Sequence, residues 1–178
     1  MPTMHDISLA QARDFALDTD APAGPIWAPP LVAAYDAQKH QVADPDLSMK
    51  MMVDAVRAWD YHVRKDSVGA TAMRFWREQY GKLHPEALGD NEAYGAPQTE
   101  AEQLDAVKSL RAAADDLQQR FGSPLVPWGE LLRLRRGALD LPLDGDVGFF
   151  GGLECLRATG TQSRDETGRF VFDGGQVV

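Results

Sequence analysis

The histidines and the single cysteine are the side chains best suited to nucleophilic or metal chemistry. His5, His40, His62 and His84 are widely separated, and no two have the spacing that puts a pair of ligands on one helix face. Cys155 has apolar or small neighbours and every histidine lies far upstream of it, which is typical of a buried thiol. We therefore expect surface or capping histidines and an unreactive cysteine.

Three aspartates that lie close together in sequence could bind a hard cation such as calcium. Asp140, Asp144 and Asp146 belong to the run L-D-L-P-L-D-G-D, but their spacing departs from that of an EF-hand loop. An Asp-Gly pair is also typical of a turn, which accounts for the run without an ion. A metal-dependent enzyme built on this loop is the least favoured alternative.

The serines and glycines add no further candidate. None of the serines lies in a G-x-S-x-G elbow or precedes a histidine in triad order: Ser8, Ser48, Ser67, Ser109, Ser123 and Ser163. The glycines around Phe149 and Phe150 form neither a dinucleotide fingerprint nor a P-loop. Residue types alone therefore assign no catalytic, cofactor-binding or metal residue.

Composition excludes several classes of protein. The chain has 178 residues, 18 Lys and Arg against 27 Asp and Glu, and one cysteine. A net charge of −9 argues against binding to nucleic acid or to an anionic membrane. One cysteine excludes an internal disulfide framework, no stretch is apolar enough to span a membrane, and the first residues are too polar for a signal peptide.

Apolar residues recur at helical spacing through most of the chain. The pattern predicts helices over residues 5–20, 30–41, 44–59, 66–81 and 99–120, with residues 83–102 as a surface loop. Capping is expected from Asp6 or Ser8, from Asp44, from Asp66 or Ser67 and from Thr99, and Gly122 should end the last helix.

After residue 124 the helical spacing of apolar residues gives way to β-prone stretches and turn residues. Two β-prone stretches, 153–160 and 169–178, predict a hairpin with a turn over 165–168. We predict a mainly α fold: a bundle-like helical section over about residues 5–135 with a small C-terminal β-hairpin. Its two sections are 1–122 and 123–178. The apolar end from Phe170 to Val178 is expected to be exposed and could support a dimer.

Several stretches resemble a known family. They are W-G-E-L-L-R-L-R-R-G (128–137), D-L-P-L-D-G (140–145), G-R-F-V-F-D-G-G (168–175), the segment 5–19 and A-W-D (58–60). In content and order they resemble the large chain of the penicillin acylase family of N-terminal-nucleophile amidohydrolases. Two positions depart from the family pattern: Leu132 stands where His or Gln is frequent, and Tyr61 stands where Gly follows W-D.

The resemblance implies an enzyme that hydrolyses amides with a serine exposed by self-cleavage at the start of its large chain. The α-amino group of that serine acts as base, and backbone N–H groups with an Asn stabilise the oxyanion. In the family these groups precede the region matched here, so no catalytic role is transferred. Residues 1–178 would be a structural interior piece of an αββα hydrolase, inert by itself, with no metal or cofactor.

The resemblance also implies the surroundings of such a piece. Its partners would be the small chain and the rest of the large chain, and the parent would be periplasmic or extracellular. Substrates would be aromatic or aliphatic acyl amides, including β-lactam side chains and acyl-homoserine lactones. The alternative is a freestanding interaction module whose Met49, Met51, Met52 and Trp59 face binds a partner helix, although a buried core is the favoured reading of that face.

Overall fold

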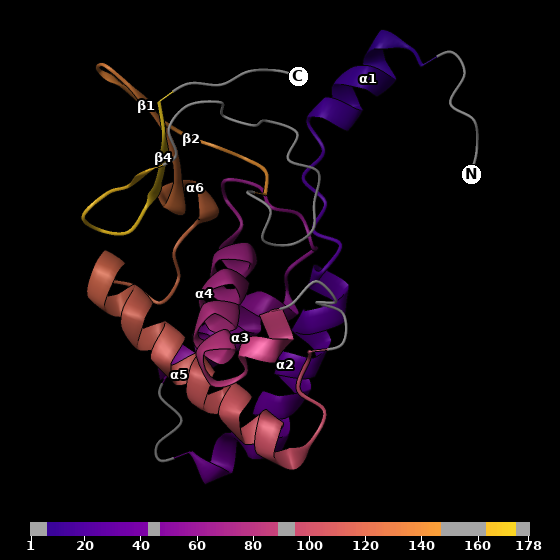
Figure 1. The fold of residues 1–178 in the computed structure, drawn as a ribbon, viewed down its shortest axis with the longest axis vertical. Helices are drawn as coiled ribbons and strands as arrows, with labels where there is room; N and C mark the ends of the chain where they lie inside the picture. Colours follow the sequence, from indigo (N-terminus) through magenta and orange to yellow (C-terminus); the bar gives the residue numbers. More distant parts are fainter. Residues whose placement is uncertain (1–6, 43–46, 89–94, 147–162, 174–178) are drawn as a thin grey trace.

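The fold was determined as a computed structural model that describes residues 7–42, 47–88, 95–146 and 163–173 (Figure 1). Its α-helices are α1 Leu9–Ala16, α2 Gly24–Gln38, α3 Leu47–Arg57, α4 Val68–Leu83, α5 Glu100–Phe121 and α6 Trp128–Leu131. Two 3₁₀ helices are η1 Lys39–Gln41 and η2 Pro85–Leu88. The strands are β1 Leu132–Arg136, β2 Leu139–Pro142, β3 Ser163–Arg164 and β4 Phe170–Phe172. The expectation of a mainly α chain is confirmed.

Helices α2 to α5 pack into one body around a core of aromatic and aliphatic side chains. Trp76 of α4 lies at its centre, fully buried, with its ring stacked on Tyr80 and edge-on to Trp27 of α2. The indole N–H of Trp76 donates to the carbonyl of Ala106 in α5 at 2.9 Å. Burying a ring of this size contributes several kcal/mol, because a large apolar area leaves water.

The predicted ends of α4 and α5 are confirmed where local chemistry fixes them. Ser67 caps α4 by accepting from the backbone N–H of Ala70. Thr99 and Glu102 form a reciprocal capping box at the start of α5, and Gly122 ends that helix with a φ of 74°. Glycine is favoured there because an L side chain strains this conformation.

The prediction for α2 is wrong at its start, whereas the predicted end at Gln41 agrees with the 3₁₀ helix η1 that continues α2. It placed the start at Pro30, since proline is tolerated in a first turn, whereas the helix begins at Gly24 and contains Pro29 and Pro30. Pro25 occupies the first turn instead. Trp27 and Leu31 are both buried, and this one-turn spacing places them on the same face of the helix. Tertiary burial therefore outweighs the local cost of two interior prolines.

The methionine-rich face of α3 belongs to the core. Met49 and Met52 are fully buried and Trp59, which follows the helix, is 7% exposed. Leu47, predicted on the same face, is 68% exposed, and the expected cap at 44–46 lies outside the described residues. Met51, the other methionine of the predicted face, is half-buried. The interaction-module alternative loses support, because Met49 and Met52 have no free surface for a partner.

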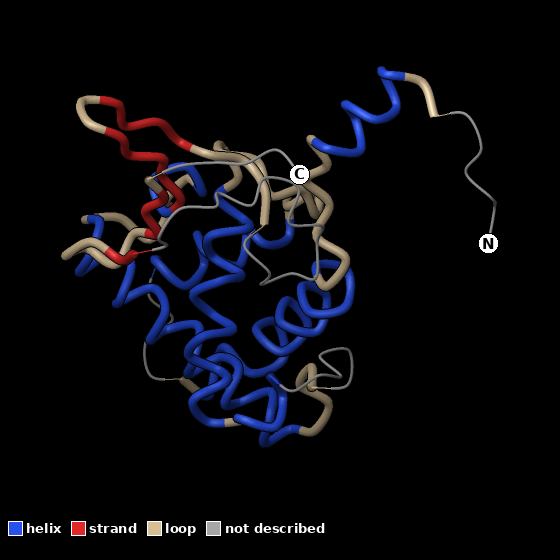
Figure 2. The backbone as a smooth tube through the Cα atoms, turned by 45° about the horizontal axis from the view of Figure 1, so that its top comes forward, coloured by secondary structure: helices blue, strands red, loops and turns tan. Residues whose placement is uncertain are grey.

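Helix α1 is shorter than the predicted 5–20 and projects away from the body in both backbone views (Figures 1 and 2). Ser8 accepts from the N–H of Gln11, while the Gln11 side chain accepts from the N–H of Ser8, so the expected serine cap is present. Among the residues that the structure describes, no helix is long and apolar enough to cross a membrane.

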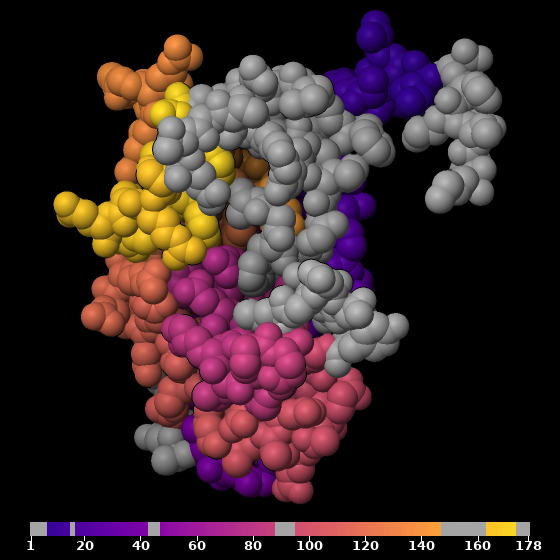
Figure 3. All heavy atoms as spheres, viewed as in Figure 1, coloured from indigo at the N-terminus to yellow at the C-terminus, as the bar shows by residue number. Residues whose placement is uncertain are grey.

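A four-stranded sheet with the order β2-β1-β4-β3 lies beside α6 at one end of the helical body (Figure 1). β1 pairs antiparallel with β2 and parallel with β4, whose Phe170 lies opposite Leu132. β3 and β4 are antiparallel and joined by the predicted turn over 165–168, where Gly168 has a φ of 82°. In the space-filling view, the sheet segments lie side by side above α5 (Figure 3).

The C-terminal prediction needs three corrections. Residues 132–136 and 139–142 form a hairpin, where the sequence indicated helix and turn. The predicted strand at 153–160 lies outside the described residues, and β4 pairs with Ser163–Arg164 instead. β4 is not an exposed edge, because β1 and β3 flank it and its two phenylalanines are 7% and 8% exposed.

Candidate functional site

The residues singled out for chemistry do not converge. His5 and Cys155 lie outside the described residues. His84 ends α4, with Asp105 3.3 Å from Nε2 and Glu86 3.3 Å from Nδ1. His40 lies on η1, on a different element from His84. Each described histidine therefore serves a different local structure.

His62 comes nearest to a catalytic arrangement. Asp20 Oδ1 lies 3.0 Å and Thr19 Oγ1 3.3 Å from its ring, but both contact the same nitrogen, Nδ1. A catalytic triad needs the carboxylate and the hydroxyl on opposite nitrogens, so that the ring can pass a proton between them. This cluster instead fastens the segment before α2 to the loop before α4.

The three aspartates of the suspected cation loop have separate roles. Asp140 accepts from Arg133 at 2.8 Å and from Arg135 at 3.0 Å. Asp144 accepts from the backbone N–H of Lys65 at 2.6 Å, and Asp146 is buried. Within the described ranges, no three His, Cys, Asp or Glu side chains are grouped to hold a metal.

Parts of four of the five stretches that carry the family resemblance meet at one place, which we call the junction: residues 19–21, 59–67, 128–129 and 143–145. The backbone N–H of Trp128 donates to Ser67 at 3.0 Å and that of Gly129 to Lys65 at 2.7 Å. The N–H of Gly145 donates to Val63 at 2.7 Å. Segments that are far apart in sequence are thus held by main-chain hydrogen bonds.

Side chains fill the space around these bonds. The indole N–H of Trp128 donates to the carbonyl of Gly145 at 3.0 Å, and that of Trp59 donates to His62 at 2.8 Å. A Cβ on Gly129 would lie 2.6 Å from Pro142, closer than side-chain carbons approach. Trp128 and Gly129 therefore have complementary roles: the indole of Trp128 donates to Gly145, and the absence of a side chain at Gly129 permits the close approach of Pro142.

Tyr61 holds the junction loop in an unusual backbone conformation. Its φ is 62°, in the left-handed region that favours glycine. This is the position where the family pattern has glycine after W-D. The Tyr61 ring packs edge-on against Trp59 at 5.5 Å and over Gly24, which compensates for the backbone strain.

The outer face of the sheet carries a closed ring of alternating charges, here called the charge ring. Its members are Glu130, Arg133, Asp140, Arg135, Asp165 and Arg169. The contacts of Arg133 and Arg135 with Asp140 and Asp165 are 2.8 to 3.0 Å long, and the other three are 3.6 to 3.8 Å. The ring joins β1 to β2, to the 165–168 turn and to α6.

Two carboxyl groups of the charge ring have a pKa below the ordinary value of an aspartate. Partial burial alone would raise the pKa of Asp165, but hydrogen bonds from Thr167, Arg169 and Arg135 lower it to about 2. The hydrogen bond from Arg133, with help from Arg135, lowers the pKa of Asp140. Both stay ionised at neutral pH, which suits bracing the sheet and not general acid catalysis.

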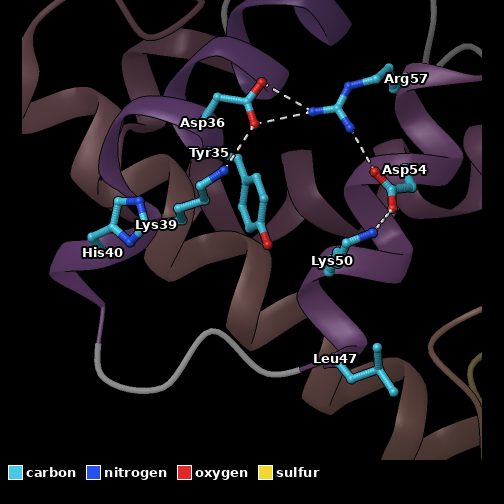
Figure 4. Close-up of a pocket in the computed structure, with 8 residues that line it drawn as sticks. All are labelled: Tyr35, Asp36, Lys39, His40, Leu47, Lys50, Asp54 and Arg57. Atoms are coloured by element: carbon cyan, nitrogen blue, oxygen red, sulfur yellow. Dashed lines mark hydrogen bonds and ion pairs between the residues drawn. The ribbon is translucent and has the colours of Figure 1, made fainter.

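A hollow of about 440 Å³ opens between α2 with η1 on one side and α3 on the other. Its lining is Tyr35, Asp36, Lys39, His40, Leu47, Lys50, Asp54 and Arg57 (Figure 4). Arg57 closes one end, because it donates to Asp36 at 3.1 and 3.2 Å and to Asp54 at 2.6 Å. Lys50 donates to Asp54 at 2.6 Å.

Sequence reasoning missed both the charge ring and the hollow. The alternation of Arg133 and Arg135 along one strand face was a usable signal for the ring, had the strand been recognised. The hollow had only helical pairs such as Lys50 and Asp54, which are common on solvated surfaces. The approach of α2 to α3 brings Asp36 to Arg57, and no local pattern encodes it.

Comparison with known proteins gives one finding. A family model described as penicillin amidase matches residues 2–177. No curated protein matches the chain. The matched range includes all of the junction and the charge ring.

Proposed function

Because the chain belongs to the penicillin amidase family, we propose that it is the helix-rich scaffold section of an enzyme that hydrolyses linear amides. The observation that carries the proposal is the junction. The Trp128-Gly129 and Asp144-Gly145 pairs come from two stretches with family-like sequence, and both are hydrogen-bonded to residues 63–67, which follow Trp59-Asp60 directly. Their shared role would be to hold the segments of the scaffold in position relative to one another.

A scaffold role also agrees with the chemistry of the described residues. The Thr19 hydroxyl and the Asp20 carboxylate contact the same ring nitrogen of His62, which is not the arrangement of a catalytic triad. The aspartates of the charge ring are paired with arginines. We infer that the nucleophile, a serine at the start of the large chain, lies in another part of the parent enzyme. There its α-amino group would take the hydroxyl proton as the oxygen attacks the amide carbon.

The finer assignments are also part of this proposal. Residues 1–178 would be an interior piece of an αββα hydrolase, in contact with the small chain and the rest of the large chain. The substrates would be acyl amides such as β-lactam side chains or acyl-homoserine lactones. The parent would act in the periplasm or outside the cell, and β2, an exposed edge strand, is one place where a neighbouring segment could pair.

The proposal is tested with the complete reading frame that encodes this chain. We expect two chains by intact mass, a larger one that begins with serine and contains residues 1–178, and hydrolysis of a chromogenic acyl anilide. The 178-residue chain alone should release no anilide product. Hydrolysis by the isolated chain, or a native product that is a single chain of 19.5 kDa, would overturn it.

A further inference from the structure

The cations that line the hollow carry more N–H donors than its two carboxylates satisfy. The Lys39 ammonium lies 3.6 Å from Asp36, beyond hydrogen-bond distance, and Lys50 uses one of its three N–H groups on Asp54. Arg57 binds both carboxylates, and each lysine ammonium faces one of them (Figure 4). An acceptor-rich group would satisfy the donors that remain.

Tyr35 is a buried residue that contributes a hydroxyl group to this hollow. The residue is only 5% exposed, yet its hydroxyl points into the hollow on the Lys50 side, away from Asp36 (Figure 4). Among the residues that the structure describes, this hydroxyl has no hydrogen-bond partner. Burial, and then the Asp54 carboxylate, raise the pKa of Tyr35, so the hydroxyl keeps its proton and remains a donor.

We propose that this hollow binds a small carboxylic acid with a short apolar body. The carboxylate would accept from the Tyr35 hydroxyl and from the ammonium groups of Lys39 and Lys50. Charge-assisted bonds of this kind are the stronger ones in proteins. The lining carries three cations and two carboxylates, a local excess of positive charge in a chain whose net charge is −9.

The hollow also offers an apolar side chain that the apolar body of the ligand could contact. Leu47 lines the hollow at the start of α3, with its side chain 68% exposed (Figure 4). Covering this leucine would remove apolar surface from water and offset part of the cost of binding. The volume of about 440 Å³ lies within the range of small-molecule sites.

The test is a titration of the 178-residue chain with hexanoate, followed by NMR. Hexanamide is the matched neutral probe, because it has the same carbon skeleton without the charge. We expect saturable shifts at Lys39, Leu47 and Lys50 with hexanoate, with a dissociation constant on the order of 1 mM. Hexanamide should produce none of these shifts.

Variants separate the proposed contacts from general effects. Tyr35→Phe keeps the buried ring and removes the hydroxyl, and Lys39→Gln removes one charge at a partly exposed site. Each should weaken hexanoate binding about tenfold, the effect of losing one hydrogen bond to a charged group. Lys108→Gln, whose lysine pairs with Asp105 on α5, should leave binding unchanged.

Several results would overturn the inference. They are equal binding of hexanamide, no saturable shift with hexanoate, and wild-type affinity in both Tyr35→Phe and Lys39→Gln. If Tyr35→Phe unfolds, Lys39→Gln decides. The outcome is independent of the proposed function, because binding is measured on this chain alone and amide hydrolysis on the complete enzyme.

Discussion

In the helical body, α2 to α5 bury whole faces of apolar side chains, whereas at the sheet end the outer face of β1 carries the charge ring. Trp76 has no exposed surface and Met49 none, while all of β2 is exposed. Apolar burial is insensitive to pH, but charged contacts weaken when a carboxylate is protonated or when salt screens it. The two ends of one molecule should therefore fail under different conditions.

The junction lies between these regions and resembles neither. Its segments are joined mainly by backbone hydrogen bonds, such as those from Gly129 to Lys65 and from Gly145 to Val63. A backbone bond between distant segments needs close approach, which glycine allows. The comparison suggests four tests, given from the largest expected effect to the smallest.

Replacing Trp76 by Ala should be the most damaging change. The ring is fully buried between Trp27 and Tyr80, so its loss leaves a cavity and costs about 3–5 kcal/mol of unfolding free energy. Urea unfolding followed by circular dichroism measures this. Leu141→Ala in β2 is the matched control: this side chain is 45% exposed, and its truncation should cost about 0.5 kcal/mol or less. Equal losses in the two variants would remove the proposed difference between body and sheet.

Gly69→Ala should destabilise the contact between α3 and α4. The added Cβ would lie 2.4 Å from the Cβ of Trp59 and 2.9 Å from the carbonyl oxygen of Ala55. We expect a loss of about 1–3 kcal/mol, although alanine is the better helix former. Gly137→Ala in the β1–β2 turn meets no neighbour within 4 Å, so only its φ of 61° opposes the change. A stabilised Gly69→Ala variant in the same urea assay would show that the helices can move apart freely.

Tyr61 tests the junction by a comparison of two substitutions. Both Tyr61→Ala and Tyr61→Gly lose the ring contact with Trp59, but only glycine relieves the strain of a φ of 62°. Tyr61→Gly should therefore be more stable than Tyr61→Ala by about 1 kcal/mol, measured by thermal and urea unfolding. If alanine proved equal or better, the loop would not hold this backbone conformation in solution.

Acid should weaken the sheet end before the helical body. Because the folded pKa of Asp165 is lowered from 3.8 to about 2, its contribution is fully present above pH 3.8 and is lost as the pH falls towards 2. The contribution is roughly 0.5–1 kcal/mol, since solvent screens a surface pair. Hydrogen exchange at β4 amides should rise over this window more than exchange in α4.

Asp165→Asn is the control for this acid effect. The variant should start with the weaker sheet at neutral pH and show a smaller further loss between pH 3.8 and 2. Uniform loosening of α4 and β4 in the wild-type chain, or an unchanged acid response in the variant, would contradict the assignment to Asp165.

Local signals in the sequence determined much of the helical body. Thr99 and Gly122 predicted the limits of α5 to within one residue, because caps and left-handed glycines act through neighbouring backbone groups. Ser67 predicted the start of α4, although the helix continues past the predicted end at Gly81 to Leu83, and the 165–168 turn was also visible. The family resemblance came from the ordered motifs around Trp59 and Trp128, and the match over residues 2–177 agrees with it.

Tertiary structure alone decided the rest. Helix α2 runs through Pro29 and Pro30 because Trp27 and Leu31 are buried against other helices. β1 is a strand because its two sides pair with β2 and β4, and its Leu-Arg alternation spans too few residues to identify a strand by itself. The junction, the charge ring and the hollow likewise join residues that only the packed chain brings within hydrogen-bond distance.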